Sequence, residues 1–225
     1  MLSAQLFRLL NTLINCRCFV FPEPGACGFR RTIHDRYPSI SLPLAPGYFD
    51  IRQLMSHPGA YRDVAEVMAA VWQRELTWVQ RVSDIRDAST PLVAILSEVT
   101  GVPMISPRLS PKARGAPQAV DGAYRSGERA ALIDDVVSEG AVSKRRALAI
   151  LRNEGLEVVF IGVVLDNRLS SGKAVDGVPV HSLLQWHASF TVLRDAGHIT
   201  DAVYEQCIAY PRQLADALRE HGIEE

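Results

Sequence analysis

Residues 130–143 read Ala-Ala-Leu-Ile-Asp-Asp-Val-Val-Ser-Glu-Gly-Ala-Val-Ser, and this stretch decides the fold. A short apolar run ends in Asp134 and Asp135, a turn of small residues follows, and a helical pattern begins near Lys144. This order predicts a strand, a loop and a helix. Ligands of open parallel sheets bind beyond the carboxyl ends of the strands, and the start of a helix offers unpaired backbone N–H groups to a phosphate. The stretch therefore indicates a site for a phosphorylated sugar, in which the two acids hold ribose hydroxyls or a metal-bound diphosphate. The alternative interpretation is a polar strand end before a turn.

The composition predicts a soluble globular protein. The 225 residues are enough for one domain plus an extension, and 48% of them are hydrophobic. The 24 Lys and Arg residues against 25 Asp and Glu residues give a net charge of -1, so no global field favours nucleic acid. No apolar run approaches the roughly 20 residues that cross a bilayer. We therefore expect neither a nucleic-acid partner nor a transmembrane segment.

Residues 1–44 differ from residues 45–225, which we expect to form the main domain. The first 22 residues contain Arg8 and Arg17 but no acid, and leucines recur there at helical spacing. This composition is typical of a mitochondrial targeting segment, with Arg30 and Arg31 as a processing region, or of a helix that docks on a partner. It predicts a location in the mitochondrial matrix. An ordinary N-terminal helix in a cytoplasmic protein is the alternative.

Three of the four cysteines lie near the N-terminus, at positions 16, 18 and 27. Their spacing matches no recognised zinc site, and no histidine precedes His34. The sequence therefore predicts no structural metal.

Strand-like and helical segments alternate between residues 76 and 165, which predicts an α/β fold with a mostly parallel sheet. The expected strands are 50–54, 76–85, 102–105, 158–165 and 178–180. The expected helices begin near residues 64, 90 and 144, and others cover 183–193, 201–209 and 212–221. Residues 106–118 have the composition of a mobile loop, with Arg108, Lys112 and Arg114 as its cations. Such a loop either closes over a phosphate or is a solvated surface loop.

Several motifs together resemble the type I phosphoribosyltransferases, and among them orotate phosphoribosyltransferase and the corresponding domain of eukaryotic UMP synthase. The similarity runs from about Tyr48 to Ala217. The motifs that carry it are Tyr48-Phe49-Asp50-Ile51-Arg52, Val120-Asp121-Gly122, Gly127-Glu128, the run 131–137, Leu165-Asp166-Asn167-Arg168 and the run 177–183. The resemblance implies a type I phosphoribosyltransferase-like fold, with a mostly parallel central sheet flanked by helices. It also implies a homodimer.

The resemblance implies specific roles for the site residues. Asp134 and Asp135 would contact the ribose, and Arg108 and Lys112 would be cations of the catalytic loop. The loop around the 5′-phosphate would comprise Ser138, Glu139, Gly140, Ala141 and Val142. The implied reaction is displacement of pyrophosphate from Mg²⁺-bound phosphoribosyl pyrophosphate (PRPP) by orotate.

Departures from the family pattern point to lost activity. Leu109 stands where the family has a lysine, Arg114 replaces a histidine, and an early family lysine is replaced near Ile40. The loop at 84–90, which should bind pyrophosphate, contains Asp87, and the phosphate turn contains Glu139. Two unit charges about 4 Å apart interact by roughly 1 kcal/mol in water and about 4 kcal/mol at an effective dielectric of about 20, so both acids oppose phosphate binding.

We therefore expect a degenerate, non-catalytic protein that serves as an accessory or structural subunit of a mitochondrial complex and needs no cofactor. The alternative is an active orotate phosphoribosyltransferase that uses PRPP and Mg²⁺. A nucleotide-binding regulator without turnover is a third possibility.

Overall fold

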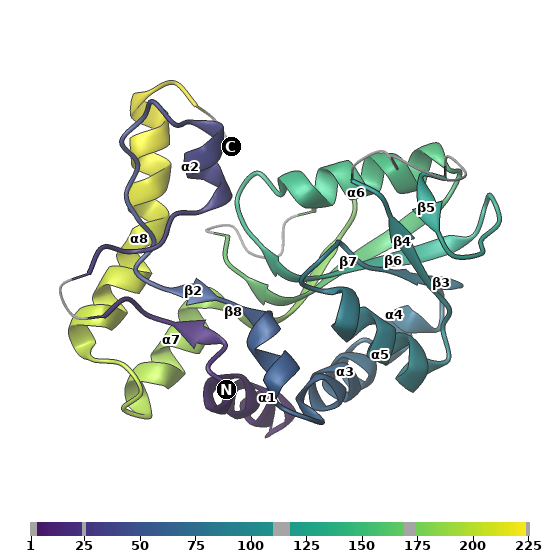
Figure 1. Cartoon of the computed structure of the whole chain (residues 1–225), viewed down its shortest axis with the longest axis horizontal. Helices are drawn as coiled ribbons and strands as arrows, with labels where there is room; N and C mark the ends of the chain where they lie inside the picture. Colours follow the sequence, from purple (N-terminus) through teal and green to yellow (C-terminus); the bar gives the residue numbers. More distant parts are fainter. Residues whose placement is uncertain (1–3, 24–25, 110–117, 169–173, 224–225) are drawn as a thin grey trace.

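A six-stranded sheet forms the centre of the molecule in the computed structural model, which describes residues 4–23, 26–109, 118–168 and 174–223 (Figure 1). The strand order is β5-β4-β3-β6-β7-β8, and every neighbouring pair is parallel except β4 and β5. The strands are β3 (Arg81–Ser83), β4 (Met104–Pro107), β5 (Val120–Asp121), β6 (Arg129–Val137), β7 (Glu157–Asp166) and β8 (Val180–Gln185). The predicted α/β fold with a mostly parallel sheet is confirmed.

Helices cover both faces of this sheet, as a mostly parallel sheet requires. One face carries α6 (Val142–Asn153), whose buried side chains include Leu148 and Leu151. The other face carries α1 (Ala4–Asn15), α3 (Ala60–Val71) and α5 (Thr90–Thr100) (Figure 1). The larger of the two apolar clusters lies on that second face.

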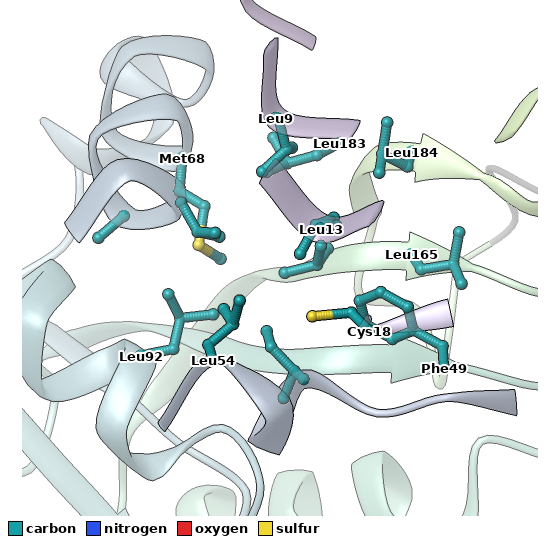
Figure 2. Packing of buried hydrophobic residues seen from close by; sticks show 14 of the residues in the cluster. Leu9, Leu13, Cys18, Phe49, Leu54, Met68, Leu92, Leu165, Leu183 and Leu184 are labelled. Carbon is teal, nitrogen blue, oxygen red and sulfur yellow. The ribbon is translucent and has the colours of Figure 1, made fainter. Parts of the chain in front are cut away.

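The N-terminal helix α1 is part of this larger cluster. Leu9, Leu10 and Leu13 are at most 2% exposed, and they belong to the same cluster as Met68 of α3 and Leu183 and Leu184 of β8 (Figure 2). The chain then forms β1 (Phe19–Val20), which pairs antiparallel with β2 (Tyr48–Phe49). The helix predicted from the leucine spacing is therefore present, with its apolar face turned into the core. The division of the chain at residue 44 stays a prediction.

Two helices stand beyond the carboxyl ends of the strands and form what we call the cap. The cap consists of α2 (Thr32–Arg36) and the C-terminal half of α8 (Asp201–Glu220), which lie side by side away from the sheet (Figure 1). The Trp186 indole N–H, in α7 (Trp186–Asp195), donates to the Cys207 carbonyl oxygen at 3.0 Å and ties α8 to α7. The cap therefore has a fixed anchor at the edge of the sheet.

Two predicted strands were wrong in extent or type. Residues Ile51–Ser56 form a 3₁₀ helix, η1, because the Asp50 carboxylate caps it by accepting the Arg52 backbone N–H at 3.2 Å. The predicted strand at 76–85 is reduced to β3, because Leu76 ends the short helix α4 (Gln73–Leu76) and a turn precedes the sheet.

The predicted ends of two helices near the C-terminus were also wrong. Residues 183–185 belong to β8, where Leu184 pairs in register with Leu165 of β7, and the helix begins only at Trp186. The two helices expected at 201–209 and 212–221 are the single helix α8, which continues through Pro211. Burial of Tyr210 and Leu218 offsets the loss of a backbone hydrogen bond at the proline.

None of the helices in the described part of the chain is both long and apolar enough to span a bilayer.

Shortening a core leucine of α1 should destabilise the whole domain. We expect Leu13→Ala to lower the free energy of unfolding by about 2–5 kcal/mol, because the side chain is fully buried. The matched control is Phe7→Ala on the same helix, where the side chain is 49% exposed and the change should stay within about 0.5 kcal/mol. Urea denaturation measures both. Equal, small effects of the two substitutions would contradict the packing of α1 in the core.

Candidate functional site

Asp134 and Asp135 lie near the carboxyl end of β6, which continues to Val137. Asp134 is 4% exposed, and both of its carboxylate oxygens are bonded. Its Oδ1 accepts the backbone N–H of Asp135 at 2.9 Å, and its Oδ2 lies 2.5 Å from the Lys144 Nζ. Asp134 is thus a buried, charge-paired carboxylate at the end of a central strand.

Lys144 belongs to the first turn of α6 and is 5% exposed. Besides Asp134, its ammonium group donates to the Val136 carbonyl oxygen and contacts the Ser143 Oγ at 3.4 Å. Each of its three hydrogens therefore has an acceptor. Sequence reasoning treated Lys144 only as the start of a helix, because Asp134 and Lys144 are ten residues apart and the sequence gives no local signal of their contact.

Asp135 lies beside this pair and lines the open space above the sheet. Its pKa is raised to about 7, first by burial and then by the negative charge of Asp134, while the positive charge of Lys144 opposes the rise. The Val136 N–H donates to its Oδ1 at 2.8 Å. Near neutral pH, Asp135 is therefore present both as a carboxylate, which only accepts hydrogen bonds, and as a carboxylic acid, which also donates one.

The turn between β6 and α6 has an uncommon backbone. Gly140 and Ala141 both have positive φ, 75° and 44°, and the Ala141 N–H donates to the Ser138 carbonyl oxygen at 3.1 Å. The helix begins at Val142, two residues before the predicted start. This turn presents the amino end of α6 toward the space above the strand ends, and Ser138, Glu139 and Val142 line that space.

A cleft of about 1090 Å³ separates the cap from the strand ends. Eight of its lining residues are cations and five are acids, an excess of three positive charges. The cations are Arg30, Arg31, Arg36, Arg52, Arg86, Lys144, Arg146 and Arg219, and the acids are Asp35, Asp87, Asp134, Asp135 and Glu139. The chain as a whole has a net charge of -1, so the cleft is a local concentration of positive charge.

Arg31 joins the cap to the sheet across this cleft. It precedes α2, and its two terminal nitrogens donate to the Asn167 side-chain oxygen at 2.7 and 2.5 Å when the amide of Asn167 is oriented toward it. Asn167 follows β7, and its N–H donates to the Val137 carbonyl oxygen at 2.9 Å. Sequence reasoning assigned Arg31 to a processing region and therefore missed its place in the cleft.

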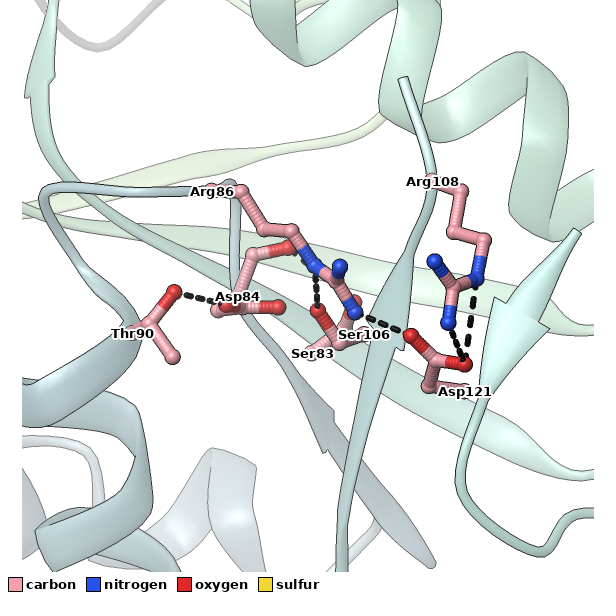
Figure 3. Close-up of polar contacts among 7 residues, drawn as sticks. All are labelled: Ser83, Asp84, Arg86, Thr90, Ser106, Arg108 and Asp121. Carbon is pink, nitrogen blue, oxygen red and sulfur yellow. Dashed lines mark hydrogen bonds and ion pairs between the residues drawn. The ribbon is translucent and has the colours of Figure 1, made fainter. Parts of the chain in front are cut away.

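A second network surrounds the loop after β3 (Figure 3). Asp121 of β5 accepts hydrogen bonds from both Arg86 and Arg108, and these two arginines hold its pKa below the ordinary value. The Arg86 Nε also donates to the Ser106 Oγ at 2.8 Å, and the Thr90 hydroxyl donates to the Asp84 carboxylate. The loop at 84–90 is therefore tied to the ends of β4 and β5.

The predicted site residues are only partly gathered in the cleft. Asp134, Asp135, Ser138, Glu139 and Val142 line it. Gly140 and Ala141 shape the turn without lining it, and Arg108 is directed to Asp121 instead. Lys112 and Arg114 lie outside the described residues.

Several known proteins have sequences and structures similar to those of this chain. The UMP synthase of Leishmania donovani superposes with a TM-score of 0.77 and 28% identity, over 94% of this chain and 43% of that one. The orotate phosphoribosyltransferase of Lactiplantibacillus plantarum is 26% identical over 160 residues, which are 70% of this chain and 75% of that protein. The chain is similar in sequence and fold to type I phosphoribosyltransferases.

Two further orotate phosphoribosyltransferases are similar to the chain. The orotate phosphoribosyltransferase of Caenorhabditis elegans is 34% identical over 125 residues, which are 56% of this chain and 55% of that protein. The orotate phosphoribosyltransferase of Aeropyrum pernix shares the fold, with a TM-score of 0.61 at 20% identity over 82% of this chain and 98% of that one. No model of a known protein family matches the chain. This phosphoribosyltransferase-like chain is therefore similar to orotate phosphoribosyltransferases over much of its length.

The raised pKa of Asp135 predicts a pH-dependent stability in this phosphoribosyltransferase-like chain. Between its ordinary value of 3.8 and about 7, the unfolded chain has released the proton while the folded chain retains it. The folded state therefore loses stability as the pH rises through this window, by at most about 1.4 kcal/mol per pH unit, and the loss levels off above about 7. Asp135→Asn should remove the loss. Urea denaturation at pH 4.5, 6 and 8 measures the free energy of unfolding of both proteins. A difference in this free energy between wild type and variant that stays the same at all three pH values would contradict the prediction.

Proposed function

We propose that this protein binds a phosphoribosyl compound in the cleft but transfers the phosphoribosyl group to orotate poorly or not at all. It is, in this proposal, a degenerate orotate phosphoribosyltransferase-like protein. The observation that carries the proposal is the position of Glu139, an acid within the turn that opens α6 and lines the cleft. A phosphate held at that turn meets a carboxylate where backbone N–H groups should be its principal neighbours.

Binding of a sugar phosphate is supported by what the cleft retains. Its lining has an excess of three positive charges, which favours an anionic ligand. Asp135 presents a carboxyl group that can accept hydrogen bonds from ribose hydroxyls. Several relatives are named orotate phosphoribosyltransferase, which gives the ligand class proposed for this cleft.

Weak transfer is supported by the charges around the expected leaving group. Asp87 lines the cleft beside Arg86, so an acid and a cation share the loop that would face a diphosphate. Arg108 is engaged by Asp121, and Leu109 stands where the family has a lysine. Because departure of pyrophosphate develops negative charge, each acid gained and each cation withdrawn raises the barrier of the transfer step.

The two acids of β6 do not fit a directly held metal ion. Both oxygens of Asp134 are already bonded, to Lys144 and to the backbone N–H of Asp135. Within the described ranges, no group of three His, Cys, Asp or Glu side chains is placed to ligate a cation. The positive charge beside the acids comes from Lys144. The proposed binding mode therefore contains no step that depends on a protein-bound metal.

An active orotate phosphoribosyltransferase is the second candidate. The observation that favours it is the number of arginines in the cleft, since Arg86 and Arg146 lie on the sheet side where a diphosphate would lie. In this alternative, these two arginines substitute for the lysine lost at Leu109, and PRPP carries Mg²⁺ into the cleft. The two candidates differ in turnover and not in binding.

Binding and turnover should be measured on the same preparation. We expect saturable binding of PRPP by calorimetry, together with pyrophosphate release in the presence of orotate below about 0.01 s⁻¹, since related enzymatic steps run at about 1–1000 s⁻¹. Release at 1 s⁻¹ or faster would overturn the degenerate assignment in favour of the active enzyme. Absence of PRPP binding at millimolar concentration would remove both candidates.

Replacing Glu139 isolates its contribution. Glu139→Gln should raise the affinity for PRPP about fivefold, the equivalent of roughly 1 kcal/mol for one opposing charge in a solvated site. The matched control is Glu157→Gln, because Glu157 is exposed at the opposite end of the sheet, at the start of β7. An unchanged affinity in Glu139→Gln would show that the carboxylate does not oppose the phosphate.

We also propose that the protein works in the mitochondrial matrix as an accessory subunit of a larger assembly. The basic, acid-free N-terminal helix supports this location, and the burial of Leu9, Leu10 and Leu13 supports the further proposal that the helix is retained after import. Intact-mass analysis of the chain from a mitochondrial fraction should give a mass that includes residues 4–20. Recovery only from the cytoplasmic fraction would contradict the location. A homodimer by light scattering, without other subunits, would contradict the assembly.

A further inference from the structure

Lys144 holds its ammonium group among oxygen atoms at the edge of the cleft. The Nζ lies 2.5 Å from the Asp134 Oδ2, donates to the Val136 carbonyl oxygen and contacts the Ser143 Oγ at 3.4 Å. A carboxylate, a backbone carbonyl and a hydroxyl are oxygen donors of the kind that bind hard divalent cations in proteins. The ammonium group therefore has the surroundings that a bound metal ion would have.

The helix itself does not favour a cation at this position. Lys144 lies in the first turn of α6, where the helix macrodipole favours negative charge and opposes a lysine. Burial adds a further cost, because the residue is only 5% exposed. The ion pair with Asp134 offsets both costs. The place of the lysine is therefore explained by the acid that it pairs with and not by the helix that carries it.

Lys144 also supplies the charge that two adjacent acids need. Asp134 and Asp135 line the cleft together with Lys144. Two neighbouring carboxylates without a cation would repel an anionic sugar phosphate. A divalent metal ion is one way of neutralising such a pair, and a buried lysine is another. Because Lys144 neutralises Asp134, the two acids present at most one net negative charge to a ligand.

A metal ion and Lys144 exclude each other at this position. One oxygen of Asp134 is bonded to Lys144, and the other accepts the backbone N–H of Asp135 at 2.9 Å. A metal ion held by the same carboxylate would lie close to the ammonium group, and the two positive charges would repel each other. The oxygen atoms at the end of β6 therefore surround one cation, which is the lysine.

We propose that Lys144 is a built-in cation that takes the place of a divalent metal ion at the carboxyl end of β6. Its ammonium group neutralises Asp134, and the protein binds a sugar phosphate without a metal ion. Lys144 is a positioning residue, because its three hydrogens bond to the protein and not to a ligand. The inference deepens the proposed function by specifying a metal-free ligand, and it rests on that function for the presence of the sugar phosphate.

Titration of Mn²⁺ into the full-length protein, followed by the electron paramagnetic resonance signal of the free ion, tests whether the lysine excludes a metal. The wild type should show no saturable binding up to about 1 mM Mn²⁺, the weak end of oxygen-ligand sites for divalent cations. Lys144→Met should gain a saturable site, because the substitution frees Asp134 beside Asp135. Mn²⁺ should also raise the unfolding temperature of Lys144→Met and leave that of the wild type unchanged.

Two matched variants separate the oxygen cluster from the general charge of the cleft. Arg146→Met removes another cation of α6 that lines the cleft, but this arginine donates to the Leu109 carbonyl oxygen, so the variant should gain no Mn²⁺ site. Asp134→Asn combined with Lys144→Met removes both charges of the pair, so it should fold and should gain no site either. Saturable Mn²⁺ binding by the wild type, or its absence in folded Lys144→Met, would overturn the inference.

Ribose 5-phosphate is the ligand probe, because it lacks the diphosphate with which PRPP carries Mg²⁺. We expect calorimetry on the wild type to give affinities in Mg²⁺ and in EDTA that agree within about threefold, which is less than 1 kcal/mol. Weaker binding in EDTA by more than this factor would overturn the inference and leave the proposed function standing. This comparison needs no variant, so it applies even if Lys144→Met does not fold. No binding of PRPP or ribose 5-phosphate in either condition would remove the proposed function, and the inference then stands or falls with the Mn²⁺ titration.

Discussion

A buried ion pair between Asp134 and Lys144 joins the end of β6 to the first turn of α6. Removing one partner of such a pair typically costs about 3–5 kcal/mol, because the other charge stays buried without compensation. The pair fixes the turn between the two elements, and that turn sets where Glu139 and the amino end of α6 meet the cleft. It also influences the pKa of Asp135, which burial raises most, the Asp134 charge raises further and the Lys144 charge lowers. The site is therefore organised by a contact within the protein.

The cleft combines two different environments. On the sheet side, acids lie among the cations that would face phosphate groups, and Asp121 draws Arg108 away from the open space. On the cap side, Arg31 is held by Asn167 beside apolar walls, and no acid is bonded to that guanidinium in the contacts that fix it. A cleft with acids among its phosphate-facing cations fits the proposed function, in which ligands bind but the transfer is not completed. The different charges on the sheet side and the cap side of the cleft are thus consistent with the function proposed for it.

The sequence predicted the elements whose signals are local. The apolar run before Asp134, the turn after it and the continuous apolar strand at 158–165 each have an unambiguous pattern, and all three are present. The contacts that define the site depend on pairs far apart in the chain. Arg31 and Asn167 are separated by most of the sequence, so no local pattern could show that they meet. Pro211 caused a different error. Because a proline usually ends a helix, two helices were predicted on either side of it, whereas packing of the cap keeps α8 continuous through Pro211.

The central claim is that the cleft holds its ligands without completing the transfer. A crystal structure of the protein grown with PRPP and orotate tests this most directly. The account predicts density for intact PRPP, with its 5′-phosphate near the turn at residues 138–142, and for unreacted orotate in the same cleft. Density for orotidine monophosphate with released pyrophosphate would contradict it.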